Sequence, residues 1–110
     1  MPHAQSELLR GTLDLLILRT LELQPLHGVG IADRISQTTR GAFQVKPGSL
    51  FPALHRLEQE GWIAGEWQQP TGARRIKTYA LTRAGRRQLA TEKAAWQRIV
   101  TAMGQVLESP

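Results

Sequence analysis

The stretch from residue 46 to residue 81 constrains the fold most, because a short amphipathic helix pattern is followed there by two strand patterns. Pro47 and Gly48 suit a helix entrance, where the φ of proline is already set and neither residue spoils the first turn. An apolar face and a polar face then repeat at helical spacing. The apolar face holds Leu50, Ala53, Leu54 and Leu57, and the other face holds Pro52, His55, Arg56 and Gln59. Pro52 is tolerated in or beside the first turn, where backbone N–H groups lack partners.

Two β-strands joined by a basic turn follow this helix. Gly61 ends the helix, because glycine readily adopts the left-handed conformation that follows a helix end. We expect strands over residues 62–67 and 74–81, with a turn at residues 70–73 that contains proline and glycine. A run of charged residues usually lies in a loop that only contacts solvent. Here the run lies close in sequence to the exposed helix, so the helix and the basic tip can contact one partner together. The basic residues at or beside the tip are Arg74, Arg75 and Lys77.

Two further helices precede this stretch. The first runs from about residue 6 to residue 23 and carries so many leucines that we expect it to be covered on more than one side. A domain this small has few elements for that task, which favours a second subunit. Pro25 and Gly28 interrupt the chain. A second helix is predicted over residues 28–38, and residues 42–46 form a short extended link.

Thr82 has the hydroxyl of a helix N-cap and precedes a last helix predicted over residues 83–108. At about 1.5 Å per residue this helix is about 38 Å long, longer than the rest of the domain can cover. Its apolar residues recur along one stripe that needs a partner, which predicts a symmetric homodimer. The predicted dimer interface comprises Leu8, Leu89, Trp96, Ile99, Val100, Met103, Val106 and Leu107.

The composition narrows the class of protein. Lysine and arginine outnumber aspartate and glutamate 14 to 9, which favours a polyanionic partner. The chain has no cysteine, so disulfides and thiolate chemistry are excluded and a cytoplasmic protein is expected. The histidines lack metal-ligand spacing, and neither a metal site nor another cofactor is expected. Without a nucleophile–base set or a glycine-rich phosphate loop we expect no catalytic residues and no enzyme, and no stretch approaches the roughly 20 apolar residues that span a membrane.

The order helix, helix, helix, strand, turn, strand, helix is typical of a winged helix-turn-helix. We therefore predict a mainly α fold with a small β-hairpin, in which residues 1–82 form the winged helix-turn-helix DNA-binding domain and residues 83–110 the C-terminal dimerisation helix. In this fold the third helix fits the major groove of double-stranded DNA and the wing meets adjacent phosphate. Winged helices also bind proteins, so a protein-interaction module without specific DNA binding is the alternative.

Three segments, in this order, closely resemble the PadR family of bacterial transcriptional regulators: GTLDLLILRTLELQPLHGVGIADRI, VKPGSLFPALHRLEQEGWIAGEW and RRIKTYALTRAGRRQL. The resemblance extends from Leu8 to Leu107 and implies a dimeric repressor that releases its DNA, an inverted-repeat operator, on binding a small molecule. The single long last helix resembles the short-tailed branch of the family. Family members usually carry tyrosine where this chain has Phe51, and loss of a hydroxyl that reaches phosphate costs on the order of 1 kcal/mol of DNA affinity.

Resemblance and geometry together define the predicted DNA contacts. We expect Lys46 and the wing cations to contact phosphate and Gly48 to allow a close approach. His55 or Arg56 is expected to read base edges. A merely solvated outward face is the alternative. The full predicted set is Lys46, Gly48, Ser49, Phe51, Pro52, His55, Arg56, Arg74, Arg75 and Lys77.

The resemblance also implies an effector site around Trp96. In short-tailed relatives a tryptophan at the matching place lies near the dimer axis and stacks on flat hydrophobic compounds, although ordinary dimer packing explains Trp96 equally well. Leu15 and Asp14 on the first helix can line the same gap, where Asp14 favours a cationic compound through its charge. Pairing with Arg10 at i,i+4 spacing explains Asp14 just as well.

Overall fold

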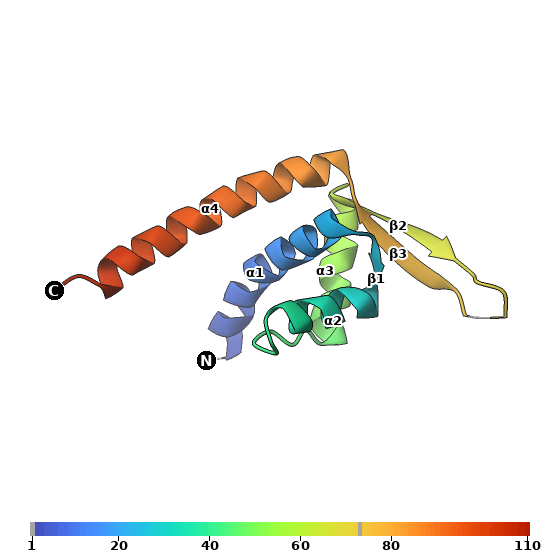
Figure 1. Ribbon diagram of the computed structural model, residues 1–110, viewed down its shortest axis with the longest axis horizontal. Coiled ribbons are helices and arrows are strands. Elements are labelled where there is room, and N and C mark those ends of the chain that lie inside the picture. Colours follow the sequence, from blue (N-terminus) through green and yellow to red (C-terminus); the bar gives the residue numbers. More distant parts are fainter. Residues whose placement is uncertain (1, 73) are drawn as a thin grey trace.

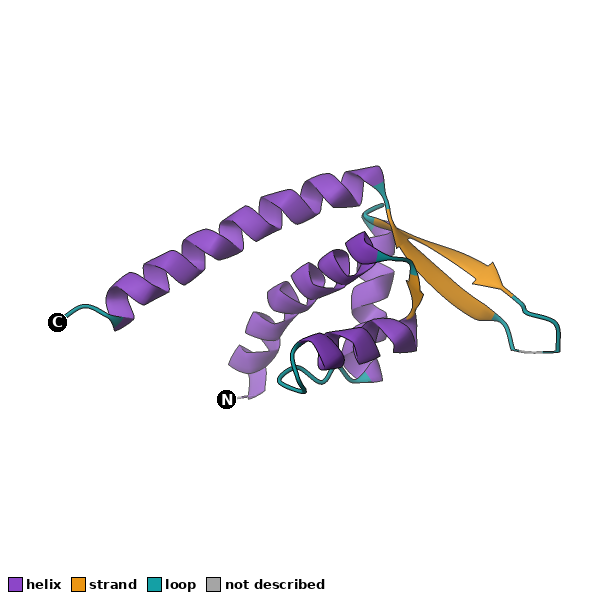
Figure 2. Ribbon diagram, in the orientation of Figure 1, coloured by secondary structure: helices purple, strands orange, loops and turns teal. Residues whose placement is uncertain are grey.

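The computed structural model describes the backbone of residues 2–72 and 74–110 and the side chains of residues 11–72 and 74–110. Within these residues the helices are α1 (Pro2–Leu23), α2 (Gly28–Thr38), α3 (Pro47–Gln59) and α4 (Arg83–Leu107), and the strands are β1 (Leu26–His27), β2 (Ile63–Gln68) and β3 (Ile76–Leu81). The helices α1, α2 and α3 form one group, the β2–β3 hairpin projects from it, and α4 runs away in the other direction (Figure 1). The mainly helical winged-helix architecture predicted from the sequence is confirmed (Figure 2).

The first helix, α1, lies at the centre of the protein. It contacts α2, α3, α4 and β3, and its Ile17 and Leu18 are fully buried. The prediction that this helix is covered on more than one side is confirmed, but the covering elements belong to the same chain. Because α4 of the same chain packs against α1, the covering of α1 gives no separate support for a second subunit, which stays a prediction.

The third helix, α3, buries the face that its periodicity predicted. Its buried side chains are Leu50, Ala53, Leu54 and Leu57. Pro52 lies on the exposed face in the second turn, just past the N–H groups that lack partners. Because proline cannot donate to the Gly48 carbonyl, that oxygen needs another partner, and Gly48 is exposed to water. The helix ends before Gly61, whose φ of 78° confirms the predicted left-handed stop.

The strands form one antiparallel sheet in the order β1–β3–β2. The strand β1, which the sequence analysis did not predict, pairs its two residues with Tyr79 and Thr78 of β3. Two residues are too few to show an alternating pattern, so this strand is visible only through its partner. The strand β3 begins at Ile76 rather than at residue 74, which leaves Arg74 and Arg75 in the connection between β2 and β3.

The last helix, α4, begins as predicted. The hydroxyl of Thr82 accepts a hydrogen bond from the Gly85 N–H at 3.0 Å and donates one to the Gly61 carbonyl at 2.7 Å. Leu89 was predicted at the dimer interface, but it is only 3% exposed in the core of this chain, and that assignment is wrong. The side chain of Leu8, predicted at the same interface, lies outside the described residues. The last turns of α4 extend away from the other helices (Figure 1).

Candidate nucleic-acid interface

The outer face of α3 is a row of exposed residues. At about 3.6 residues per turn, the residues opposite the buried side of α3 lie in one row along the helix. The exposed members of this row are Gly48, Pro52, His55 and Gln59. A Cβ built at Gly48 meets no described atom within 4 Å. Lys46, which is also exposed, accepts the first helical hydrogen bonds of α3 through its carbonyl. The helix therefore starts with little steric bulk beside a cation.

One flank of this row faces α1 and holds Arg56. Its Nη2 donates to Asp14 Oδ1 at 2.5 Å, and the side chains of Arg56 and Asp14 are 36% and 15% exposed. Arg56 was expected to read base edges and Asp14 to line an effector gap or pair within α1. The structure brings Arg56 and Asp14 together, because α1 and α3 pack side by side. The side chain of Arg10, the other predicted partner of Asp14, lies outside the described residues. The salt bridge ties α3 to α1 and leaves His55 as the exposed ring on the row.

The opposite flank of α3 faces α2 and carries Phe51. The Phe51 ring is 46% exposed. A Cβ built at Gly28, the first residue of α2, lies 2.9 Å from Phe51 Cε1. The ring therefore packs across the start of α2, and a glycine there leaves room for it. The phenylalanine keeps the aromatic packing between the helices while lacking a hydroxyl.

On the same flank, Glu58 joins α3 to the hairpin. Its Oε1 accepts a hydrogen bond from Lys77 Nζ at 2.8 Å, and its Oε2 accepts one from the Gly65 N–H at 3.2 Å. The hydrogen bond from Lys77 lowers the pKa of Glu58 below its ordinary value of 4.5, and the bond to Glu58 raises the pKa of Lys77 above 10.5. Lys77 was predicted to contact phosphate. Its side chain is 26% exposed and its Nζ bonds to Glu58, whereas Arg74 and Arg75 are exposed near the tip.

The Glu58–Lys77 pair predicts a defined pH dependence of stability. Because the pKa of Glu58 is lowered in the folded state, its carboxylate stabilises the fold above pH 4.5, and this stabilisation is lost as the pH falls through the folded-state pKa. Because the pKa of Lys77 is raised, its ammonium group stabilises the fold below pH 10.5, and this stabilisation is lost as the pH rises through the folded-state pKa. We expect Glu58→Gln to cost about 0.5–1 kcal/mol at neutral pH, because both side chains are partly exposed. Urea unfolding of both proteins between pH 3 and pH 9 measures this. A difference that stays constant down to pH 3 would contradict the assignment.

The wing presents Arg74 and Arg75, which are both exposed. The Arg75 guanidinium lies over the ring of Trp67, with Cζ 4.6 Å from the ring centroid, and Lys77 Nζ lies 5.7 Å from the same centroid. Trp67 is 55% exposed. Trp67 was predicted in a strand, but its contact with the wing cations was not predicted. A tryptophan opposite a basic strand segment is a sequence signal for such a contact.

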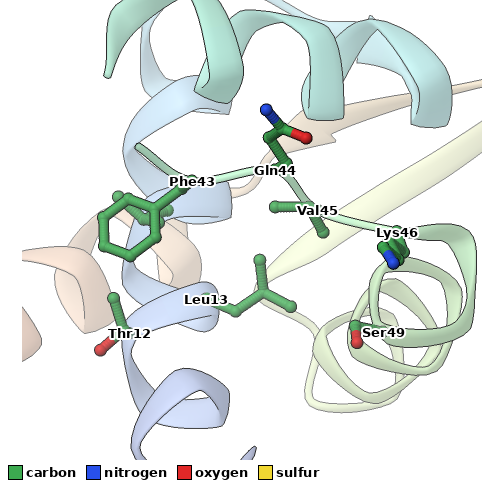
Figure 3. A pocket seen from close by; sticks show the side chains of 8 residues that line it. Thr12, Leu13, Phe43, Gln44, Val45, Lys46 and Ser49 are labelled. Atoms are coloured by element: carbon green, nitrogen blue, oxygen red, sulfur yellow. The ribbon is translucent and has the colours of Figure 1, made fainter. Parts of the chain in front are cut away.

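A cavity of about 240 Å³ lies between α1 and the start of α3. In Figure 3 Phe43 and Thr12 lie on one side of this cavity and Lys46 and Ser49 on the other, at α3, with Leu13 and Val45 between them. Ser49 was predicted to contact DNA, and the structure places it at the edge between this cavity and the outer row of α3. Its exposed position keeps it beside the Gly48 surface.

A second hollow, of about 390 Å³, lies between α1 and α4. It brings together Leu15 and Trp96, two of the three residues predicted for an effector site, along with Gly11, Glu92 and Ile99. The third, Asp14, is not one of its lining residues and points to α3. From this hollow onward α4 exposes a run of large apolar side chains, the first two of which also line the hollow. They are Trp96 (44%), Ile99 (53%), Val100 (50%), Met103 (56%), Val106 (75%) and Leu107 (77%).

The comparison with known proteins decides the family. The sequence profile of the transcriptional regulator PadR-like family matches residues 17–91, more than half of the chain. The chain belongs to this family. The PadR-like family is a family of transcriptional regulators.

Individual relatives agree with this assignment. The transcriptional regulator Rv3488 of Mycobacterium tuberculosis is 32% identical over 93 residues, which cover 84% of this chain and 83% of that protein. A PadR family transcriptional regulator from Eggerthella lenta has a TM-score of 0.82 at 30% identity, covering 94% of this chain and 88% of the other. A transcriptional regulator from Clostridium thermocellum has a TM-score of 0.83 over 90% and 96% of the two chains; at 24% identity this likeness concerns the fold alone.

The described part of this PadR-like chain shows no cluster of three or more histidine, aspartate or glutamate side chains arranged to hold a metal ion. Of the helices described, none is long and apolar enough to cross a bilayer. Three exposed surfaces are candidates for binding a partner: the outer row of α3, the wing, and the apolar run on α4.

Proposed function

We propose that this PadR-like protein is a dimeric repressor that binds an inverted-repeat operator and releases it when a small hydrophobic or planar effector binds. Residues 1–82 form the DNA-binding unit, and residues 83–110 carry the dimer contact. The observation that carries the proposal is the exposed row on α3, open at Gly48 and joined through Glu58 to a wing that bears Arg74 and Arg75. Such a row fits a major groove while the wing reaches phosphate.

The proposed DNA contacts separate into positioning and reading. Lys46, Arg74 and Arg75 contact phosphate, which fixes register without reading sequence. Among the exposed side chains of the row, His55 and Gln59 have groups that hydrogen-bond to base edges. With only two such side chains, one protein subunit discriminates weakly between DNA sequences. Two copies at a fixed spacing, each reading a half-site, supply the rest.

The dimer rests on the apolar run of α4. The exposed fraction rises from 44% at Trp96 to 77% at Leu107, while charged residues occupy other positions of the helix. An apolar stripe of this length on one side of a projecting helix marks a contact with another protein surface. A second copy offers the same stripe, and a twofold axis buries both at once.

Replacing both wing arginines with alanine is expected to weaken DNA binding on all sequences alike. Each phosphate contact contributes nearly one to the slope of log affinity against log salt, so Arg74→Ala/Arg75→Ala should lower the slope by roughly two. Fluorescence anisotropy with the DNA upstream of the protein's own gene, and with a scrambled duplex, measures this over a salt series.

The matched control is Lys93→Ala/Arg98→Ala, which removes the same charge from exposed positions of α4. It should change the slope far less, because α4 runs away from the wing (Figure 1). An unchanged slope in the arginine variant would overturn the wing assignment. If the wild-type protein lacks affinity for either duplex at low salt, the proposed function fails and a protein-interaction module is favoured.

The effector is expected to bind in the hollow that Leu15 and Trp96 share. A planar dye should quench Trp96 fluorescence in a variant whose two other tryptophans are replaced, Trp62→Phe/Trp67→Phe, because stacking places the dye against the ring. Replacing Trp96 with alanine in the wild-type background should weaken binding of the dye, measured by the dye's own anisotropy. Dye affinity untouched by Trp96→Ala would show that the compound binds elsewhere, with the cavity beside Phe43 as the alternative.

A further inference from the structure

One face of the β2–β3 hairpin carries Trp67, Lys77 and Arg75. Trp67 and Lys77 are directly paired across the two strands, so their side chains leave the sheet on the same side. Arg75, two residues before Lys77, reaches the same ring from the wing connection, with 4.6 Å between its Cζ and the ring centroid. The tryptophan is therefore in contact with one cation from the strand and one from the wing.

The inner end of this arrangement is fixed to α3. Lys77 Nζ bonds to Glu58, and the other oxygen of Glu58 accepts the Gly65 N–H at the edge of β2. A Cβ at Gly65 would lie 2.3 Å from Lys77 Cε and 2.9 Å from Glu58 Oε2. Glycine at this position is what lets the lysine cross β2 and reach the carboxylate. The contacts thus run without a break from Glu58 in α3 through Lys77 and Trp67 to Arg75.

This chain of contacts restricts the motion of a side chain in an exposed wing. An arginine in an exposed connection samples many rotamers, and fixing it on a phosphate costs conformational entropy. Stacking of the planar guanidinium on an aromatic face restricts those rotamers in advance and leaves the N–H edge free to donate. Trp67 is too exposed, at 55%, to serve the protein core as its main role.

We propose that Trp67 is a positioning residue for Arg75 in DNA binding, and that the Glu58–Lys77 pair fixes the tryptophan relative to α3. This inference rests on the proposed function, because it requires the wing to contact DNA. Its consequence is that the distance between the row on α3 and the wing phosphate contact is set by side chains and not by the hairpin backbone alone.

A double-mutant cycle on DNA affinity tests the coupling. The variants are Trp67→Ala, Arg75→Ala and the double replacement, and the probe is a fluorescein-labelled mixed-sequence duplex at about 50 mM salt. Trp67→Ala is expected to weaken binding about two- to five-fold in the wild-type background, the range of an exposed cation–π contact. It should have no further effect once Arg75 is absent. Trp67→Phe keeps a ring and should retain most of the affinity.

The matched control is Ile76→Ala, next to Arg75 but on the other face of the hairpin and also exposed. Its effect should be the same with and without Arg75. In a Glu58→Gln background the coupling between Trp67 and Arg75 should shrink toward none, and this coupling is the measure to use, because the lost negative charge by itself raises DNA affinity. Melting temperatures confirm that each variant folds.

The outcomes separate the two levels of the argument. If Trp67→Ala weakens binding by the same factor with and without Arg75, the tryptophan acts alone or only supports the hairpin, and the positioning role is refuted while the proposed function stands. If Arg75→Ala binds the duplex as tightly as wild type, or if the wild-type protein does not bind it, the wing contact itself fails and this inference fails with it.

Discussion

Replacing Ile99 and Met103 with glutamate is expected to convert the protein to a monomer and to lower its affinity for an inverted-repeat operator about 10²-fold or more. The two side chains are 53% and 56% exposed and lie one turn apart on the apolar run of α4. In a twofold dimer they meet the same run of the partner, so the Ile99→Glu/Met103→Glu variant places four carboxylates in one desolvated contact. Light scattering after gel filtration measures the mass, and fluorescence anisotropy measures the DNA affinity.

The loss of affinity follows from linkage between two half-sites. Once one half of a dimer is bound, the other half experiences a high effective concentration of its half-site, and a monomer loses that advantage without losing any contact of its own. We therefore expect the monomeric variant to retain weak, salt-sensitive binding to any duplex. The operator and a scrambled sequence should then be bound almost equally.

The control for this prediction is Thr101→Glu/Gln105→Glu. Both residues are exposed on α4, lie one turn apart, and occupy the side of the helix away from the apolar run. The same charge is added in the same helix, so mass and affinity should change little. A dimeric Ile99→Glu/Met103→Glu variant would remove α4 as the dimer contact. A monomer with full operator affinity would instead refute the need for two copies.

The sequence predicted the local structure correctly where a single residue type determines the backbone conformation, or where the apolar residues of a helix all lie on one face. The apolar face of α3, the stop at Gly61 and the N-cap at Thr82 each depend on neighbours within a few residues, and all three were predicted. Such features follow from hydrogen-bond and dihedral preferences that the chain carries locally. The winged-helix order follows from them.

The features that escaped prediction depend on how distant segments approach one another. Arg56 and Asp14 are 42 positions apart, and their pairing requires the packing of α3 on α1. A polar residue on the outer side of a helix pattern looks the same whether it meets solvent or a neighbouring helix. For the same reason Leu89 was read as part of an interface stripe, although α1 covers the first turns of α4 and leaves only the later ones exposed.

Replacing Gly85 with alanine is expected to destabilise the protein by about 1–3 kcal/mol, a sizeable share of the roughly 5–15 kcal/mol that holds a typical domain folded. A Cβ at this position would lie 2.0 Å from the Trp62 carbonyl oxygen and 2.7 Å from Leu81 Cδ1. The first of these is a backbone atom that already accepts the Thr82 N–H at 3.1 Å. Urea unfolding at a fixed protein concentration measures the change, because the proposed dimerisation would make the apparent stability depend on concentration.

The size of the effect comes from two losses that occur together. Relieving the overlap requires the start of α4 to move off the hairpin, and overpacking of this kind costs about 1–3 kcal/mol. The same movement strains the Thr82 cap, whose hydroxyl spans Gly61 and Gly85, and a lost cap costs about 1 kcal/mol more. The higher helix propensity of alanine returns at most about 1 kcal/mol. Gly48→Ala is the control: no described atom lies within 4 Å of its Cβ position, so its stability should equal that of wild type or exceed it by up to about 1 kcal/mol. A Gly85→Ala protein within about 1 kcal/mol of wild type would mean that α4 is free to shift on the hairpin, in which case α4 could not hold two DNA-binding units at the fixed spacing that operator reading requires.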